Sequence, residues 1–248
     1  MKKNILLTGS TGKLGKRILK RNKDLSILSP SRKELDITSQ TSVENFFKNN
    51  SFDSIVHCAA LARMGECEAN PDEAFKTNTL GTFHLVNNVR SLEKSSGRKI
   101  RFIYISTDGV YACDKGNYDE SSPTIPYNVY GWSKLGGETV ARTLEDLCII
   151  RTRFFDPENI PFDKSADDLI TSSIEINKLV KIIFFLLSDT FKGVINIGNK
   201  ESSEFLRYIA HKPSLQKCKR ADITKNLSFE IAKNASMNIS LMKKLIKQ

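Results

Sequence analysis

ILLTGSTGKLG, residues 5–15, is the stretch that decides the fold. The apolar run of residues 5–7 leads directly into Gly9, Gly12 and Gly15, where a helical pattern begins. Glycine permits a tight turn and a close approach to phosphate, and the first N–H groups of a helix attract negative charge. This order predicts a turn that binds a dinucleotide, and a purely structural glycine turn is the alternative.

Short apolar runs alternate with longer amphipathic stretches along the chain. We predict strands at 5–7, 26–29, 54–58, 101–106, 148–151 and 194–197, and helices near 13–22, 40–49, 72–94, 128–145 and 176–188. Repeated strand-then-helix order predicts the α/β class, as a Rossmann-type doubly wound parallel sheet. Such sheets bind their ligands at the carboxyl ends of the strands.

The alternation loosens after Phe155, where two prolines interrupt it. We therefore expect residues 1–153 to form a dinucleotide-binding Rossmann core. Residues 154–248 are expected to form a small substrate-side region packed on that core, with the strand at 194–197 returning to the sheet.

Composition narrows the class of protein. The 248 residues are 40% hydrophobic and 27% charged, which is ordinary for a soluble globular domain. The best candidate for a membrane span, the apolar run of residues 182–187, is too short to cross a bilayer. The five cysteines are scattered and lack the paired spacing of a metal site, so we expect reduced thiols, a cytoplasmic protein and no metal.

The net charge of +10 suits an anionic partner. The chain has neither a recognition-helix motif nor alternating aromatic and basic residues, so we predict no nucleic acid and no membrane partner. An anionic cofactor or substrate accounts for the basic balance, and solvated lysines on helix surfaces are the simpler alternative.

The second predicted strand leads into Ser29-Pro30-Ser31-Arg32-Lys33. A site for NAD usually has an acidic residue here, which holds the ribose 2′-hydroxyl, whereas a cation suits a 2′-phosphate. We therefore predict that NADP(H) is preferred and NAD(H) remains possible, with Arg32 as the main contact and Ser31 assisting. An ordinary surface arginine is the alternative. Asp36 and Ile37 follow closely and are expected beside the adenine.

Tyr130 and Lys134 are four residues apart, so on a helix they share one face. An adjacent ammonium is expected to lower the pKa of the tyrosine. Such a tyrosine can give a proton to a carbonyl oxygen while hydride reaches the carbon. Lys134 is also placed to bond the nicotinamide ribose, and Thr107, at the end of the fourth strand, is expected to bond the same carbonyl oxygen.

The spacing Tyr-x-x-x-Lys occurs three times in the chain. Tyr111 and Lys115 lie in a stretch typical of a turn, and Tyr208 and Lys212 lie in a predicted helix far beyond the nucleotide-binding half. Only the third pair opens a helix downstream of a strand that ends in Ser-Thr.

These motifs together resemble the extended short-chain dehydrogenase/reductase family, and within it the dTDP-4-dehydrorhamnose reductase-like, sugar-nucleotide-binding branch. The resemblance is dense through about residue 153 and thin afterwards. It is carried by residues 5–9, 35–38, 57–60, 77–81, 105–108 and 128–131, and by 235–240 near the C-terminus.

The resemblance implies a role for each matching position. The cofactor contacts are Gly9, Thr11, Gly12, Lys13, Leu14 and Gly15 at the pyrophosphate, Asp36 and Ile37 at the adenine, Ala59, Ala60 and Leu61 beneath the ribose, and Tyr130 with Lys134 at the nicotinamide end. The catalytic residues are Tyr130, Lys134 and Thr107, and the contacts to the sugar are Thr107 and Asp108. Asn78 matches a position near the active site, with a purely structural role as the alternative.

The activity implied is NAD(P)H-dependent reduction of a keto group on a nucleotide-linked sugar, in polysaccharide biosynthesis. Two departures from the branch stand out, namely Gly109 where an aromatic residue is usual and Phe154 in a segment that usually carries Trp. Arg153 either holds a substrate phosphate or balances surface charge. The alternatives are a non-catalytic NAD(P)-binding regulatory or accessory subunit and a nucleotide-sugar epimerase. The oligomeric state is open, and a homodimer is one option.

Overall fold

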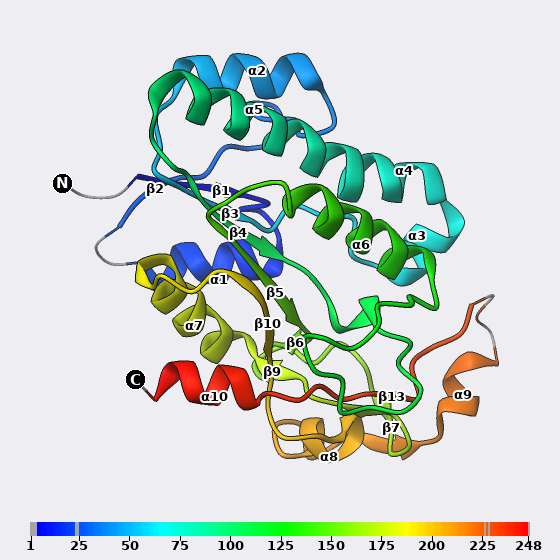
Figure 1. The fold of residues 1–248 in the computed structure, drawn as a ribbon. Coiled ribbons are helices and arrows are strands. Elements are labelled where there is room, and N and C mark those ends of the chain that lie inside the picture. Colours follow the sequence, from blue (N-terminus) through cyan, green and yellow to red (C-terminus); the bar gives the residue numbers. More distant parts are fainter. Residues whose placement is uncertain (1–3, 23–24, 226, 228, 248) are drawn as a thin grey trace.

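A six-stranded parallel sheet forms the centre of the computed structural model, which describes residues 4–22, 25–225, 227 and 229–247 (Figure 1). The strand order is β10-β5-β4-β3-β1-β2. The strands are β1 (Asn4–Thr8), β2 (Ser26–Leu28), β3 (Ser54–His57), β4 (Arg101–Ile105), β5 (Leu147–Thr152) and β10 (Gly193–Ile197). The predicted class and all six predicted strands are confirmed. The outer ends of the expected ranges 1–153 and 154–248 lie outside the described residues.

Helices cover both faces of the sheet (Figure 1). One layer holds α2 (Gln40–Asn49), α5 (Gly81–Ser96) and α6 (Val129–Ala141), and the other holds α1 (Lys13–Arg21), α7 (Ile176–Ser188) and α10 (Ser240–Ile246). Alternate residues of each strand enter opposite layers, because a strand has a period of two. In β4, Phe102 and Tyr104 pack under α5 and α6, whereas Ile103 and Ile105 pack on α1 and α7.

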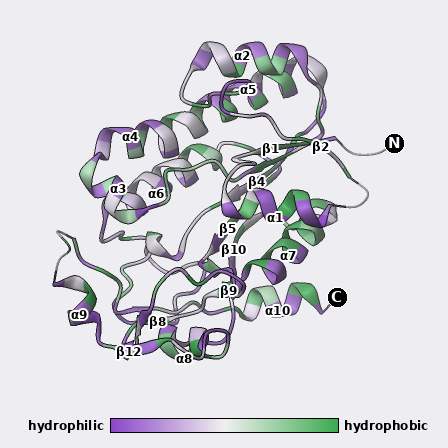
Figure 2. Cartoon of the chain, turned by 180° about the vertical axis from the view of Figure 1, so that it is seen from behind, coloured by the Kyte–Doolittle hydropathy of each residue, from purple (hydrophilic) through white to green (hydrophobic). Residues whose placement is uncertain are grey.

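The covering helices carry hydrophobic and hydrophilic residues in the same element (Figure 2). The buried positions of α7 are Ile176, Leu179, Val180, Ile183, Leu186 and Leu187. Their spacing of three and four places them on one face of a helix, which therefore gains stability only by packing on the sheet. The same spacing had predicted a helix at 176–188, which is confirmed.

The segment expected as one helix at 72–94 is three consecutive elements. It comprises α4 (Pro71–Phe75), a π-helical turn (Lys76–Leu80) and α5, preceded by α3 (Met64–Ala69). A π turn inserts extra backbone into a helix and occurs often at functional sites. Here it turns the buried Asn78 toward α6.

Short strands and helices form the peripheral region after residue 153 (Figure 1). The helices are α8 (Glu204–Ile209) and α9 (Arg220–Thr224), and a 3₁₀ turn (Asp108–Val110) precedes the region in the chain. The strands are β6 (Phe154–Phe155), β7 (Lys164–Ala166), β8 (Ile170–Thr171), β9 (Ile174–Glu175), β11 (Ser202–Ser203), β12 (Gln216–Cys218) and β13 (Asn234–Ala235). Within residues 154–248, α7, β10 and α10 pack with the central sheet. The division into a core and a substrate-side region stays a prediction.

Gly137 permits the close approach of α6 to the sheet. A Cβ at this position would overlap the hydroxyl of Tyr104 and lie 2.7 Å from the carbonyl oxygen of Asn78. Both neighbours are buried and held by hydrogen bonds, so neither can move aside at low cost.

We predict that Gly137→Ala lowers the free energy of unfolding by about 1–3 kcal/mol, because it overpacks this contact. Gly65→Ala is the matched control in α3, since its new methyl group would meet only ordinary contacts at 3.6 Å. Urea denaturation of both variants checks the prediction. Equal stability of the two would contradict the packing that we describe.

Candidate functional site

The candidate site lies at the carboxyl ends of the parallel strands. Chain connections run from β1 to β2 on one side and on to β3 on the other, so the strand order reverses between β1 and β3. Open α/β sheets bind ligands in the crevice outside such a switch point. A cavity of about 250 Å³ lies there, lined by Thr8 at the end of β1 and Cys58 just after β3.

The glycine turn forms one wall of this cavity. Gly9 has a φ of +70°, which favours glycine, and a Cβ there would lie 2.5 Å from the backbone nitrogen of Ala59. The Gly12 N–H donates to the Gly9 carbonyl at 3.0 Å and closes the turn. Gly12 is also the N-cap of α1, and no side chain caps that helix. The first N–H groups of α1 therefore remain available to an anion.

Most of the predicted cofactor contacts line the cavity. They are Gly9, Thr11, Gly12, Arg32, Asp36, Ile37, Ala59 and Ala60. Sequence reasoning had assigned no cofactor role to Thr8, Ser10, Pro30, Leu35, Thr38, Cys58 and Thr77, which complete the lining.

Six predicted cofactor contacts lie outside this lining, namely Tyr130 and Lys134 on α6 and the four residues described next. Lys13 is exposed on the first turn of α1, and Leu14 is buried in the hydrophobic core. Gly15 packs against the turn itself, where a Cβ would lie 2.7 Å from the Cα of Ser10. The backbone N–H and carbonyl of Leu61 are both bonded by the side chain of Asn78, at 2.8 and 2.9 Å.

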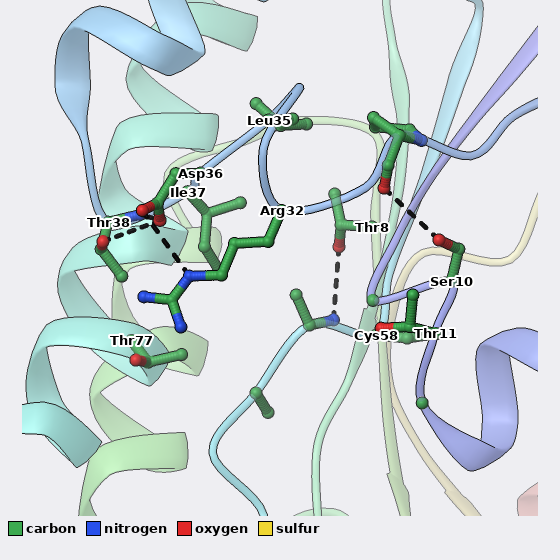
Figure 3. Close-up of a pocket in the computed structure, with 15 residues that line it drawn as sticks. Thr8, Ser10, Thr11, Arg32, Leu35, Asp36, Ile37, Thr38, Cys58 and Thr77 are labelled. Carbon is green, nitrogen blue, oxygen red and sulfur yellow. Dashed lines mark hydrogen bonds and ion pairs between the residues drawn. The ribbon is translucent and has the colours of Figure 1, made fainter.

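Arg32 extends from its loop toward Asp36 and Thr77 (Figure 3). Its Nε lies 3.6 Å from Asp36 Oδ2, and 77% of its side chain is exposed. Burial opposes ionisation of Asp36, but hydrogen bonds from Thr38 and the charge of Arg32 together hold its pKa below the ordinary value. Ser31 does not line the cavity, and its N–H donates to Glu34 at 2.7 Å.

Tyr130 and Lys134 lie on the first two turns of α6, as expected. Asn128 caps this helix by accepting a hydrogen bond from the Gly131 N–H at 2.7 Å. Thr107 lies beside the phenol, and its hydrogen bond opposes the rise in the pKa of Tyr130. A Cβ at Gly131 would overlap the Gly109 carbonyl, so a glycine here lets the loop after β4 meet α6.

The expected lowering of the pKa of Tyr130 is wrong. Burial raises this pKa well above the ordinary value of a tyrosine, and the Asp108 carboxylate raises it further. The Lys134 ammonium lies elsewhere, with Nζ 4.1 Å from the ring centroid of Tyr104. Tyr130 is therefore protonated at neutral pH.

Lys134 is 2% exposed. Burial lowers the pKa of its ammonium to about 7, although the Glu138 carboxylate opposes the shift. Burial raises the pKa of the Cys58 thiol, which lines the cavity, to about 12, and the charge of Lys134 opposes that rise. Lys134 on α6 therefore lies near enough to the cavity lining for its charge to act on Cys58.

Asp108, predicted to contact the sugar, is buried and bonded to Arg153. Arg153 Nε donates to Asp108 Oδ2 at 2.6 Å, and its Nη1 donates to Glu204 Oε1 at 3.4 Å. Arg153 thus joins the end of β5 to the loop after β4 and to α8. Its guanidinium is therefore paired with two carboxylates, and a contact with a substrate phosphate stays a prediction. Glu204 was missed, because no local pattern marks it.

The two competing Tyr-x-x-x-Lys pairs do not form helical pairs. Tyr111 is buried, and Lys115 follows it in a turn where Cys113 has a φ of 58°. The prediction of a turn is confirmed. The helix expected to hold Tyr208 and Lys212 ends at Ile209, so the helical prediction is wrong for Lys212.

A family model described as "RmlD substrate binding domain" matches residues 1–159. The chain is 35% identical over 152 residues to a dTDP-4-keto-6-deoxy-D-glucose reductase of Streptomyces niveus, covering 59% of this chain and 51% of that protein. It is 33% identical over 153 residues to the spore coat polysaccharide biosynthesis protein SpsK of Bacillus subtilis, covering 60% and 52%. The match thus spans about half the length of these curated relatives.

Solved structures share the fold over nearly the whole chain. A dTDP-4-dehydrorhamnose reductase of Bacillus anthracis, in complex with NADP, aligns with a TM-score of 0.84 and 22% identity over 99% of this chain and 92% of that one. A hypothetical dTDP-4-dehydrorhamnose reductase of Sulfolobus tokodaii aligns with a TM-score of 0.81 and 26% identity over 99% and 94%. Because the family model matches well over half of its residues, the chain belongs to the RmlD substrate binding domain family.

Proposed function

We propose that this protein is an NADPH-dependent reductase of a keto group on a nucleotide-linked sugar. The observation that carries the proposal is the Tyr130 phenol beside the Thr107 hydroxyl, with the buried ammonium of Lys134 one turn further along α6, at the edge of the sheet that also holds the cavity lined by the glycine turn and Arg32. The names of the relatives support the substrate class, since those proteins are reductases of dTDP-linked keto sugars.

The residues present fit a phosphorylated dinucleotide. A Cβ at Gly9 would fill the cradle beside Ala59, and the uncapped start of α1 offers N–H groups to the pyrophosphate. Arg32 would hold a ribose 2′-phosphate, and Asp36 and Ile37 would lie beside the adenine. When bound, the nicotinamide supplies hydride to the substrate carbon.

The protein's own groups supply the proton. The phenol of Tyr130 is protonated at neutral pH and would serve as the proton donor to the carbonyl oxygen, although burial makes it a weaker acid than an ordinary tyrosine. Thr107 would orient that oxygen by a hydrogen bond. The Lys134 ammonium would bond the nicotinamide ribose. Asp108, held by Arg153, would receive a hydrogen bond from the sugar.

Two alternatives share parts of this site. A non-catalytic accessory subunit would need the cavity but not the Tyr130 and Lys134 pair. A nucleotide-sugar epimerase would use the same pair and keep its NAD bound, and solved epimerases share the fold. The cytoplasm, and a homodimer as one possible assembly, stay predictions.

The first experiment measures the loss of NADPH absorbance with a panel of nucleotide-linked 4-keto sugars. We expect Tyr130→Phe to lower turnover by roughly 10²–10⁴-fold while sparing NADPH binding, because only proton donation is removed. Tyr118→Phe is the control, since its hydroxyl bonds the peripheral Asp114. NADPH binding without oxidation of any sugar would favour the accessory subunit, and NAD that co-purifies with the protein would favour the epimerase.

Arg32→Ala tests the choice of cofactor. We expect it to weaken NADPH binding roughly tenfold or more and to leave NADH binding nearly unchanged, because a charge-assisted bond to the 2′-phosphate is lost. Lys33→Ala is the matched control, since Lys33 is the next cation and does not line the cavity. Fluorescence titration with both nucleotides measures the effect. An equal loss for NADPH and NADH would contradict the role of Arg32.

Lys134→Met tests the cost of the buried ammonium. The unfolded chain keeps the ordinary pKa near 10.5, whereas the folded pKa is about 7, so folding disfavours the charged form. We expect the variant to be more stable at pH 7 by on the order of 1–3 kcal/mol, while its turnover is lost. The difference should shrink as the pH rises toward 10, where neutral Lys134 no longer penalises folding.

Urea denaturation across this pH range measures the difference in stability. Lys48→Met, on the exposed side of α2, serves as the control and should change stability little at any pH. A gain from Lys134→Met that does not depend on pH would show that burial of the charge is not its cause.

A further inference from the structure

Glu138 and Arg151 form a buried ion pair behind the candidate site. Their side chains are 0% and 2% exposed. Arg151 Nε donates to Glu138 Oε1 at 3.0 Å, and Arg151 Nη2 donates to Glu138 Oε2 at 2.8 Å. The pair joins α6 to the carboxyl end of β5.

The pair belongs to a continuous network of buried polar groups. Ser106 Oγ donates to Glu138 Oε1 at 2.6 Å. On the other side, Arg151 Nη1 donates to the Tyr111 hydroxyl at 2.9 Å, and that hydroxyl donates to Asn196 Oδ1 at 2.9 Å. The network therefore links α6 to β4, β5 and β10 at the carboxyl edge of the sheet, where the candidate site lies.

A gain in folding stability alone is a weak explanation for a buried ion pair of this kind. Removing two charges from water costs about as much as their attraction returns, so apolar side chains of similar volume often serve a fold equally well. Another ion pair lies at the opposite edge of the sheet, between Arg101 at the start of β4 and Asp146 just before β5, at 2.7 Å. That second pair lies far from the site and offers a natural comparison.

The position of Glu138 points to the reacting groups. It lies one helical turn after Lys134 on α6, and its hydrogen bond holds Ser106, the residue before Thr107. A single carboxylate thus contacts the strand end that carries Thr107 and the helix that carries Tyr130 and Lys134. Arg151 fixes that carboxylate in a bidentate geometry, which adds directional precision.

We infer that Glu138, held by Arg151, is a positioning residue that sets Thr107 against Tyr130 and couples electrostatically to Lys134 one helical turn away. This inference rests on the proposed function for the roles of those three residues. The electrostatic coupling between Glu138 and Lys134 does not depend on that function and is measurable without any substrate.

The charges around Lys134 agree with this coupling. The groups that face it are Tyr104 from β4, His57 and Cys58 from β3 and the residue after it, and Glu138 from its own helix. Of these, Glu138 is the main group that favours the ammonium, while burial opposes it. Arg142 also approaches Glu138, at 3.9 Å, from the solvent side.

The decisive experiment is an NMR titration of the intact protein labelled with ¹³C at lysine Cε. The resonance of Lys134 is assigned by its loss in Lys134→Met. We expect its midpoint to lie near pH 7 in the wild type. In Glu138→Gln the midpoint should move to lower pH, because the neutral amide no longer favours the ammonium. Asp146→Asn is the control and should leave the midpoint in place.

A second variant keeps the test valid if Glu138→Gln does not fold. Glu138→Met/Arg151→Met removes both charges and leaves no unpaired ion, so it is expected to stay folded. It should also lower the midpoint of Lys134. A wild-type midpoint in the folded double variant, or in folded Glu138→Gln, would overturn the inference.

Turnover then tests positioning. We expect both variants to lower kcat by roughly 10- to 100-fold with little change in KM, as displaced reacting groups do. The alkaline limb of the kcat profile should move to lower pH together with the NMR midpoint. An unchanged kcat and pH profile would overturn the positioning role. Wild-type protein that reduces no sugar would overturn the proposed function instead, and the NMR result would still decide the coupling.

Discussion

The desolvated ammonium of Lys134 is the constraint on which the rest of the site depends. It lies against the ring of Tyr104, where α6 packs closely on β4 because Gly137 has no side chain. A charge in such a place lowers stability unless nearby groups compensate it. Glu138 provides the compensating charge and is itself neutralised by Arg151. Buried charged groups of α6 and β5 are therefore coupled near the carboxyl edge of the sheet.

Desolvation also raises the pKa of Tyr130. A tyrosine that stays protonated at neutral pH is a proton donor, which suits reduction of a carbonyl. The Asp108 carboxylate raises the pKa of Tyr130 further, and Arg153, which pairs with Asp108, limits that rise. Arg153 also reaches Glu204 on α8, so the peripheral region contributes directly to the electrostatics around Tyr130.

Among the described residues, no helix is long and apolar enough to cross a bilayer.

Much of the fold and of the cavity lining follows from local sequence patterns. Short apolar runs predict the strands of the central sheet, and Gly9 and Gly12 lie at the turn that follows the first of them. The rest depends on packing between distant segments. The contact of Arg153 with Glu204 joins residues 51 positions apart, and the raised pKa of Tyr130 arises from burial that no spacing reveals. The two-residue strands of the peripheral region are too short to carry a period of their own.

The central claim is that Tyr130 and Lys134 serve hydride transfer to a sugar carbon. Its most direct test is incubation of the protein with NADPH deuterated at the transferable position of C4 and a nucleotide-linked 4-keto sugar, followed by mass spectrometry of the sugar. We predict a product that carries a single deuterium at the former carbonyl carbon. A reduced product without deuterium, or deuterated cofactor that remains intact beside unreacted sugar, would contradict the account.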